Sequence, residues 1–388
     1  MIHDNFGILA ILLTIPAVIF LSQQIPLVQR FFKVVPPLVF AYFIPSLLSN
    51  LGMIPRSAEI YTSIKTFLLP ASLLLLTLAV DIRGILRLGP KAGLLFLAGT
   101  AGVVLGGPVA LWLFRSHLAP EIWKGMAALS GSWIGGGANF IAIGKAVGAG
   151  DDVLGKMVIV DVIVAYTWTG ILLFLAGRAG TIDGKTGADT SAIEDLQERV
   201  SHFQESTSRN PTTTDWMVLT AVAALGSYLS YRIGNGLPEL GSVLSHSTWR
   251  VITVTTIGVL LSFTPAKSLE GIGASRLGTV FLYLLIGVIG ANADFTALGE
   301  VPWLLAAALV WIVIHILVLF LVLRLVRAPL FFLAVGSQAN IGGAASAPIV
   351  AAAFHPALAS VGVMLGIAGY VLGTYAALIC AALLQWVA

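Results

Sequence analysis

Long apolar windows are the feature that most restricts how this chain folds. A membrane-crossing helix needs about 20 consecutive, mostly apolar residues. Charged residues are only 10% of the chain, against roughly 25% in an ordinary soluble domain. The pattern predicts an all-α polytopic membrane protein with about twelve (11–13) transmembrane helices, because a β-barrel would show alternating segments of about ten residues. The windows lie near residues 7–22, 34–53, 62–81, 92–114, 122–148, 153–177, 215–234, 249–265, 277–292, 302–323, 329–353 and 359–387.

The charges and the single cysteine exclude several classes of protein. The net charge is +3, but the basic residues fall mostly between windows, where they orient helices, so no nucleic-acid partner is expected. Cys380 lies in the last window, which leaves no disulfide framework and no cysteine metal site. The first window follows MIHDN, which lacks a basic segment, and we interpret it as a retained span. We expect a multi-pass protein of the bacterial inner (cytoplasmic) membrane, or of the chloroplast envelope in a plant.

A polar segment divides the chain into two halves of similar length. Residues 178–214 form the predicted linker between a first transmembrane repeat (1–177) and a second (215–388). Ile193, Leu196, Val200 and Phe203 fall at helical spacing inside the linker, which predicts a short amphipathic helix there.

The two halves contain matching motifs in the same order. GSWIGGGANFIAI at 131–143 corresponds to GSQANIGGAASAPI at 336–349, and Ile134-Gly135-Gly136 matches Ile341-Gly342-Gly343 after a two-residue slip. Asp81 precedes the first motif as Asp294 precedes the second. Each motif is followed by a last window that contains an aromatic residue, Tyr166 or Tyr370. The ordered matches indicate an internal duplication, which is frequent in secondary transporters.

The distribution of lysine and arginine favours an inverted relation between the repeats, since the sidedness of these residues turns over between the halves. Six spans per half would place equivalent helices in the same orientation, however. Inversion therefore requires that one window be miscounted or re-entrant, and parallel repeats remain the alternative.

Clustered glycines interrupt one window in each half. Glycine destabilises a helix interior by about 1 kcal/mol relative to alanine, and unwound backbone at membrane depth is tolerated where it lines a cavity. We therefore expect broken helices that cross near the midplane and aim half-helix ends at a bound ion or solute. Close packing through small residues is the alternative, but it does not explain the neighbouring amides. The predicted binding residues are Ser130, Ser132, Gly135, Gly136, Gly137, Asn139, Asp161, Ser337, Gln338, Asn340, Gly342, Gly343 and Ser346.

Two kinds of cation coupling fit these residues. Neutral hydroxyl and amide oxygens suit a hard cation such as Na⁺, and the predicted Na⁺ ligands are Ser132, Asn139, Ser337 and Asn340. Asp161 lies within an apolar window. An ionisable group there is energetically costly and by default functional, so coupling to protons through Asp161 is the alternative. Asp81 and Asp294 sit at window ends and are interpreted as loop caps, and His315 as a packed histidine.

The motifs SGSWIGGGANF and GSQANIGGAASAP, with the polar central linker, resemble an uncharacterised bacterial and chloroplast membrane family catalogued as a domain of unknown function. The resemblance covers nearly the whole chain. More distantly, the layout is similar to the bile acid:sodium, sodium:glutamate and 2-hydroxycarboxylate symporters, whose ligand residues are not reproduced closely enough here to carry over. This resemblance implies inverted repeats and an elevator-type movement of a core against a dimer-forming scaffold. The residues it places at the crossing are Ser132, Gly136, Asn139, Ser337, Asn340 and Gly343.

The sequence therefore predicts a cation-coupled secondary transporter of a small organic solute such as an organic acid, amino acid or peptide. Na⁺ is favoured over H⁺ as the coupling ion, no other cofactor is expected, and the expected partners are the solute, a monovalent cation, the lipid bilayer and a second copy in a homodimer. A cation/proton antiporter is the alternative within transport. An intramembrane enzyme or a non-transporting scaffold is the alternative outside it. We expect no enzyme, because HExxH and GxxxxGK[ST] are absent and because we interpret the chain as lacking a motif such as GxGD with two facing membrane carboxylates.

Overall fold

The computed structural model describes residues 2–32, 37–80, 84–85, 88–188, 193, 211–240, 244–292, 301–355 and 358–388. Within these residues the chain consists of helices joined by turns and short loops, and its β-structure is limited to an isolated bridge between Leu240 and Leu244. The helices are α1 (Asn5–Ser22), α2 (Pro26–Phe32), α3 (Pro37–Asn50), α4 (Glu59–Leu78), α6 (Pro90–Phe114), η1 (Arg115–His117), α7 (Ile122–Gly135), α8 (Gly137–Ala146), α9 (Asp151–Ala176), α10 (Ala179–Thr186), α12 (Thr213–Gly236), α13 (His246–Ser262), η2 (Pro265–Ile272), α14 (Ala274–Asn292), α15 (Val301–Leu325), α16 (Leu330–Ile341), α17 (Gly343–Phe354) and α18 (Ala359–Val387).

The local sequence explains where several helices begin. Thr212 and Asp215 form a capping box at the start of α12, and the Ser245 side chain accepts the Thr248 N–H at the start of α13. Pro90 occupies the first position of α6, where its missing N–H has no helical partner to lose.

Seven helices in the described part of the chain are long and apolar enough to cross a membrane. The number is eight if α13 and η2, bent by 96° at their junction, form one span. The prediction of an all-α polytopic membrane protein is confirmed. Each of the twelve windows coincides with a helix or a pair of helices, but α3 has only 14 residues and two windows are broken into shorter helices. The count of twelve crossings stays a prediction.

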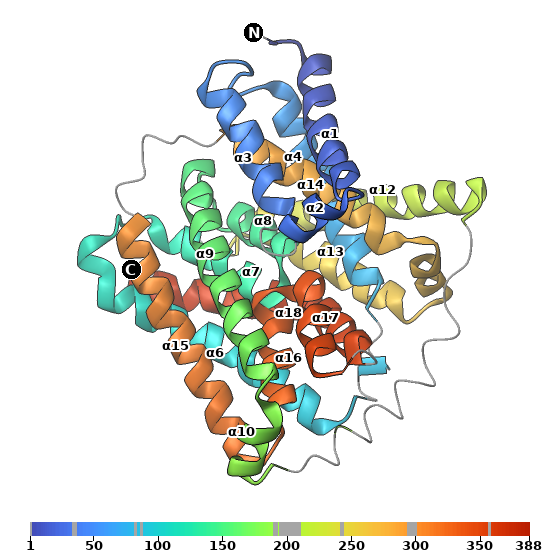
Figure 1. Cartoon of the computed structure of the whole chain (residues 1–388). Helices are drawn as coiled ribbons and strands as arrows, with labels where there is room; N and C mark the ends of the chain where they lie inside the picture. The colour runs from blue at the N-terminus through green and yellow to red at the C-terminus, as the bar shows by residue number, and fades with distance from the viewer. Residues whose placement is uncertain are drawn as a thin grey trace.

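The helices pack as two groups that each draw on both halves of the chain (Figure 1). We call α1, α3, α4, α12, α13 and α14 the flanking group. In Figure 1 they occupy the upper part and the right-hand side. We call α6–α9 and α15–α18 the break group, because it contains both interrupted windows.

Equivalent helices of the two halves pack in matching ways. In the flanking group, α4 packs against α14, α3 against α14 and α13 against α4. In the break group, α6 packs against α15, while α7 contacts α18 and α16 contacts α9. Each of these contacts between a helix of one half and a helix of the other is thus repeated by the corresponding helices with the halves interchanged. A duplicated chain with an internal two-fold relation would produce this pattern. The orientation of the repeats stays a prediction, and Asp81 and Asp294, which helped to define them, lie outside the described residues.

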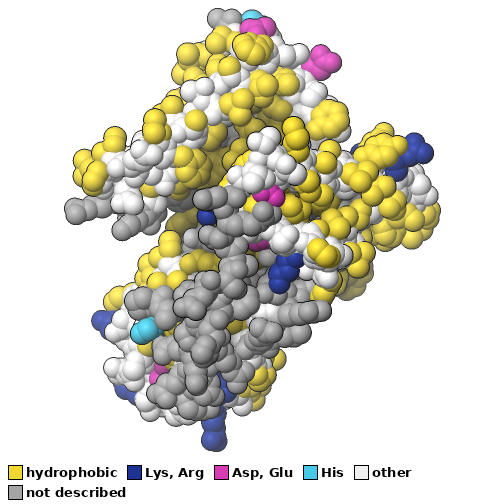
Figure 2. All heavy atoms as spheres, turned by 90° about the vertical axis from the view of Figure 1, so that its right-hand side faces the viewer, with side chains coloured by type: hydrophobic (Ala, Val, Ile, Leu, Met, Phe, Trp, Pro, Cys, Tyr) yellow, Lys and Arg dark blue, Asp and Glu magenta, His cyan; other side chains and the backbone are white. Residues whose placement is uncertain are grey.

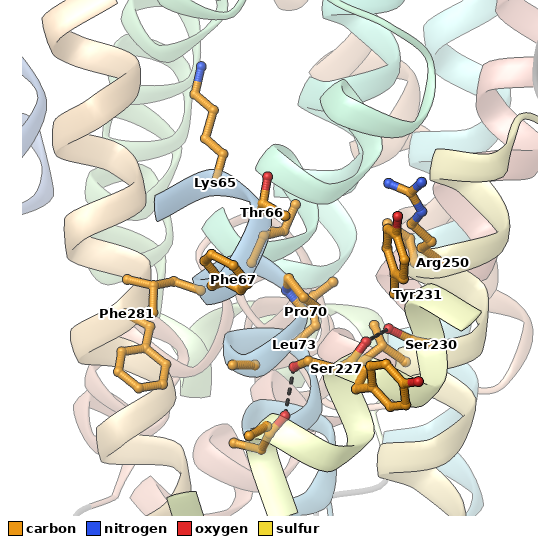
Figure 3. A pocket seen from close by; sticks show the side chains of 18 of the residues that line it. Lys65, Thr66, Phe67, Pro70, Leu73, Ser227, Ser230, Tyr231, Arg250 and Phe281 are labelled. Carbon is orange, nitrogen blue, oxygen red and sulfur yellow. Dashed lines mark hydrogen bonds between the residues drawn. The ribbon is translucent and has the colours of Figure 1, made fainter. Parts of the chain in front are cut away.

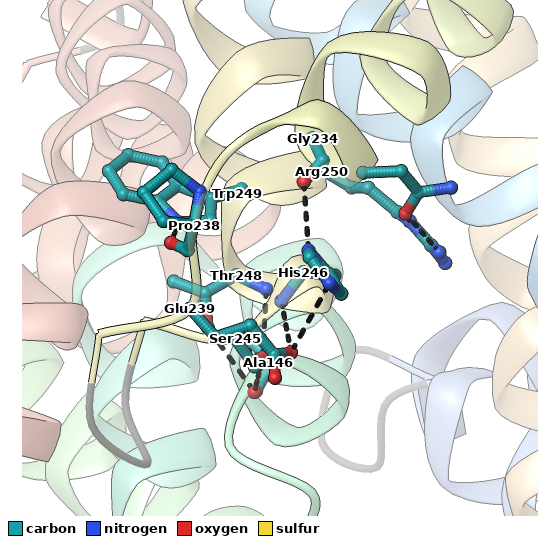
Figure 4. Close-up of polar contacts among 10 residues, drawn as sticks. Ala146, Gly234, Pro238, Glu239, Ser245, His246, Thr248, Trp249 and Arg250 are labelled. Carbon is teal, nitrogen blue, oxygen red and sulfur yellow. Dashed lines mark hydrogen bonds and ion pairs between the residues drawn. The ribbon is translucent and has the colours of Figure 1, made fainter.

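The end of α8 is tied to the flanking group through one backbone carbonyl. Figure 4 shows the Ala146 oxygen beside the start of α13, where it accepts the hydroxyls of Ser245 at 2.9 Å and Thr248 at 3.3 Å. The two hydroxyls satisfy a helix-end carbonyl that has no partner within α8. This cluster is therefore one polar contact between the two groups.

The beginning of the predicted linker is folded. Helix α10 occupies residues 179–186, and the Asp183 carboxylate accepts the Leu330 N–H at the start of α16 at 2.8 Å. Burial raises the pKa of Asp183 above its ordinary value, although the Leu330 N–H opposes the rise. Of the predicted amphipathic helix, only Ile193 lies within the described residues.

Large apolar areas lie on the surface. Figure 2 shows one face on which hydrophobic side chains cover much of the part that is coloured, with charged side chains scattered among them. Phe6, Met217 and Leu325 are among the exposed large apolar residues. A hydrocarbon environment would cover such a surface without loss of stability, which agrees with a multi-pass membrane protein.

Candidate functional site

The first helix break falls at Gly136, between α7 and α8. Its backbone has φ 75° and ψ −173°, a conformation that is essentially confined to glycine. The Gly136 N–H donates to the Ser132 carbonyl at 2.8 Å and ends α7, and the Gly136 carbonyl accepts the Phe140 N–H and begins α8. The glycine cluster in the first half therefore interrupts its helix, as the sequence predicted.

The second break separates α16 from α17 at Gly342 and Gly343, and Gly343 has φ 59°. A Cβ built on Gly343 would lie 3.9 Å from the Cα of Gly136. The glycine clusters are about 200 residues apart in the sequence, yet their breaks face each other in the fold.

Helix α18 has a row of glycines that brings it close to both breaks. A Cβ on Gly366 would lie 2.5 Å from the backbone nitrogen of Ala344, and a Cβ on Gly369 would lie 2.5 Å from the Ile134 carbonyl oxygen. A Cβ on Gly362 or Gly373 would come similarly close to neighbouring backbone atoms. The spacing of 362, 366, 369 and 373 is the small-residue signature of close helix packing, and our site prediction did not include it.

Asn139 and Asn340 fasten the broken helices to their neighbours. The Asn139 amide donates to the carbonyls of Gly135 and Tyr370 and accepts the Thr374 hydroxyl at 2.7 Å. The Asn340 amide donates to the carbonyls of Phe96 and Gly336, and it accepts the Thr100 hydroxyl at 2.8 Å. Each side chain is fully buried, and its amide oxygen accepts a hydrogen bond from a threonine. This geometry gives both amides a role in holding the breaks, whereas their predicted role as Na⁺ ligands stays a prediction.

Ser337 is held in a separate buried cluster. Its hydroxyl oxygen accepts the Trp168 indole N–H at 2.8 Å and lies 2.8 Å from His315 Nε2. The second ring nitrogen of His315 lies 2.9 Å from the Gly99 carbonyl, so this nitrogen carries the proton and Ser337 donates to Nε2. The packed role expected for His315 agrees with this arrangement.

A cavity of about 500 Å³ lies where the two breaks meet, and we call it the break cavity. Its walls come from both breaks and from residues of the flanking group such as Tyr42, Leu282 and Tyr283. Eight of the predicted binding residues line it: Ser132, Gly136, Gly137, Asp161, Gln338, Gly342, Gly343 and Ser346. The other five, Ser130, Gly135, Asn139, Ser337 and Asn340, are buried but are not part of this lining.

Asp161 projects from α9 into the break cavity and accepts two hydrogen bonds from α7. Ser132 donates its hydroxyl to one carboxylate oxygen at 2.5 Å, and Trp133 donates its indole N–H to the other at 2.9 Å. Each carboxylate oxygen of Asp161 therefore has a hydrogen-bond donor on α7. The structure thus joins Ser132 and Asp161, which the sequence identified separately.

Gln338 presents an acceptor without a partner. Its Nε2 donates to the hydroxyl oxygens of Thr169 at 2.8 Å and Ser346 at 2.6 Å. The Thr169 hydroxyl donates to the Ala165 carbonyl, which fixes the orientation of the amide. Gln338 Oε1 is fully buried and has no hydrogen-bond partner among the residues that the structure describes. A buried unpaired oxygen is costly, and a bound cation or N–H group would satisfy this one.

Our sequence reasoning missed Glu270, which also lines the break cavity. It lies in η2, and its carboxylate accepts the backbone N–H of Ser275 at 2.9 Å and the Ser275 hydroxyl at 2.6 Å. Tyr166 and Tyr370, used above only as markers of the duplication, line the same cavity. Among the described residues, the lining contains two carboxylates and no lysine or arginine, so its side chains favour positive charge.

The interpretation that the chain lacks a GxGD motif is wrong. A GxGD sequence is present, as Gly148-Ala149-Gly150-Asp151. Asp151 begins α9 and pairs with Lys65 at 2.6 Å, and Asn292 donates to the same carboxylate. Ten residues, or about 15 Å of helix, separate it from Asp161, and Asp151 is not part of the break-cavity lining. Within the described residues no group of three or more His, Cys, Asp or Glu is placed to hold a metal ion.

The fold and the break cavity define a multi-pass α-helical membrane protein with a buried polar site between paired helix breaks. The chain belongs to the family described as "Protein of unknown function (DUF819)", whose model matches residues 10–387. It is also similar to "Uncharacterized membrane protein YjcL" of Bacillus subtilis (strain 168), with 24% identity over 341 residues that cover 84% of each chain. These matches confirm the family resemblance, and the more distant relation to the sodium symporters stays a prediction.

Proposed function

We propose that this protein is a cation-coupled secondary transporter and that the break cavity is its binding site. One observation carries the proposal: the two helix breaks, one from each half of the chain, line a single cavity. Secondary transporters commonly bind their substrates where discontinuous helices of two repeats meet.

The polar side chains of the break cavity support a monovalent cation as one ligand. Asp161 supplies negative charge, and Gln338 Oε1 supplies a buried acceptor that has no partner within the described part of the chain. Hydroxyl oxygens of Ser132, Thr169 and Ser346 line the same cavity. Oxygen donors of this kind favour Na⁺, and a proton on Asp161 is the alternative coupling ion.

The helix ends support a small organic solute as the other ligand. Gly137 and Gly343 are the first residues of α8 and α17, and both line the break cavity. The N-terminus of a helix carries partial positive charge and attracts carboxylates. A cavity with positive helix ends and negative side chains suits an amino acid, a peptide, or an organic acid that enters with its cation.

The position of the break cavity supports alternating access. Its lining combines residues of the break group with Tyr42 and Tyr283 of the flanking group and with Glu270 of η2, which packs against the flanking group. Movement of one group along the other would therefore carry half of the site with it, which is the elevator mechanism. We further propose a homodimer formed through the flanking group, in the bacterial inner membrane or the chloroplast envelope.

Thermal unfolding of the purified protein in Na⁺, compared with K⁺ or choline at fixed pH and ionic strength, tests the proposal. An ion at a hundredfold excess over its Kd stabilises the folded state by about 2.7 kcal/mol. We expect a Na⁺-specific rise in melting temperature that Gln338→Met abolishes, because methionine keeps the length of the side chain but lacks the oxygen. Gln24→Met, at an exposed position, is the matched control. A Na⁺ effect that Gln338→Met leaves intact would contradict the assigned site.

A cation/proton antiporter is the second candidate, and Glu270 is the observation that favours it. Antiport by exchange at carboxylates needs acidic groups within one site, and Asp161 has no acidic neighbour in the sequence. The fold adds Glu270 to the lining of the same cavity.

A further inference from the structure

A second cavity, separate from the break cavity, lies between α4, α12 and α13. It measures about 740 Å³, within the range of about 300–1,000 Å³ that is typical of ligand sites. Figure 3 shows its walls, and we call it the α12 cavity. Lys145, at the end of α8, also lines it.

Basic side chains gather at one end of the α12 cavity. Lys65 and Arg250 lie at the upper end in Figure 3, and the charges of both act on Lys145. Asp151 pairs with Lys65 at 2.6 Å, and Arg250 donates to the neutral amide oxygen of Asn235. Three cations and one carboxylate leave a formal charge of +2, so this end favours an anion.

The opposite end of the α12 cavity is apolar. Leu73 follows Lys65 by eight residues on α4, or about 12 Å along the helix. Pro70, Val254 and Phe281 also line the walls. The Ser227 and Ser230 hydroxyls donate to backbone carbonyls of α12 and are therefore already satisfied. These apolar walls would not contribute to the binding of a soluble anion.

The rim of the α12 cavity lies on the apolar surface of the protein. Phe67 is 69% exposed and Tyr228 is 57% exposed, and both line the cavity. Met217 and Leu225 continue the exposed apolar surface along α12. The basic residues lie near helix ends, where the headgroup region of a bilayer would be, and the apolar walls lie deeper along the helices.

We propose that the α12 cavity binds an anionic phospholipid, with the phosphate between Lys145 and Arg250 and an acyl chain along α4 and α12. Basic pockets between membrane helices are suited to anionic headgroups. This site is distinct from the break cavity and does not depend on the proposed transport.

Binding of dioleoylphosphatidylglycerol to the detergent-solubilised protein, measured by native mass spectrometry and melting temperature, tests the site against dioleoylphosphatidylcholine. We expect retention of phosphatidylglycerol and a rise in melting temperature with this lipid only. Lys145→Gln should weaken binding about fivefold, which corresponds to the loss of one cationic contact. Lys185→Gln, exposed on α10, is the matched control.

A second variant tests the apolar part of the proposal. Ala224 lines the α12 cavity at an exposed position, so Ala224→Trp should fill the space and abolish lipid retention without disturbing the core. Ala221→Trp lies on the same helix outside this lining and should retain the lipid. Equal binding of the two lipids, or unchanged binding by Lys145→Gln and Ala224→Trp, would overturn the proposal. An equal rise in melting temperature with glycerol 3-phosphate alone would instead indicate a soluble-anion site.

Discussion

The Thr374 hydroxyl donates to the Asn139 amide oxygen across 2.7 Å, and this bond fixes the first helix break to α18. At the second break, the Asn340 amide oxygen accepts a hydrogen bond from the Thr100 hydroxyl of α6 in the same way. In both cases a buried amide binds a neighbouring helix and leaves no oxygen directed at the break cavity. The amides beside the glycines therefore explain how the breaks are kept open.

Asn139→Ala should destabilise the protein. The change removes the acceptor of Thr374 and the donor to the Gly135 and Tyr370 carbonyls, and each buried polar group left unpaired costs about 1–3 kcal/mol. We expect a clear fall in melting temperature in detergent, compared with little change for Asn5→Ala at an exposed position. An unchanged melting temperature combined with a lost Na⁺ response would contradict this structural role and support the predicted role of Asn139 as a ligand.

Gly136→Ala should cost about 1–3 kcal/mol, because the φ and ψ of this residue are strained for any side chain. Gly137→Ala is the matched control on the next residue. A Cβ there meets nothing closer than 3.7 Å. Chemical or thermal unfolding of the two variants gives the comparison. Equal stabilities would mean that the break does not depend on the positive φ of Gly136.

The helices and both breaks could be predicted from the sequence, because apolar length and glycine clustering act locally along the chain. The pairing of Gly136 with Gly343 followed from the duplicated motifs. Glu270 could not be predicted, since it reaches the site only because η2 turns by 96° from α13. The same limit applies to Asn139: the sequence shows a polar side chain beside a break, but its partners come from α18, more than 200 residues later.

The count of membrane crossings was harder to predict for a related reason. A window of apolar residues looks the same whether its helix is continuous or interrupted. Helices α7 and α8 share one window, as do α16 and α17, and each of the four is too short to span a bilayer alone. Whether such a pair of helices crosses the membrane or returns to the side from which it entered depends on tertiary packing.

Asp183→Asn should change how stability depends on pH. Burial raises the pKa of Asp183 in the folded state above its ordinary value of 3.8, so folding favours the protonated form. The parent protein should therefore lose stability as pH rises from about 3.8 through the raised pKa. Asparagine does not titrate and keeps an oxygen for the Leu330 N–H.

The measurement is the melting temperature of Asp183→Asn and the parent across this pH range. The variant should gain stability relative to the parent as pH rises. Asp152→Asn, at an exposed position on α9, is the control and should follow the parent. A difference that is constant with pH would mean that Asp183 acts only as the cap of α16.

Asp161→Asn and Glu270→Gln should separate the two proposed transport modes. Asp161 receives both of its hydrogen bonds from the broken helix α7, whereas Glu270 binds Ser275, five residues later in the chain. In a symporter the Na⁺-specific rise in melting temperature should be lost in Asp161→Asn and kept in Glu270→Gln, since glutamine still accepts from Ser275.

In an antiporter, proteoliposomes given a Na⁺ gradient should move protons, as reported by an internal pH-sensitive dye. Either substitution should then stop this flux, because exchange would use both carboxylates of the break cavity. A Na⁺-driven proton flux in the parent would therefore reject the symport model.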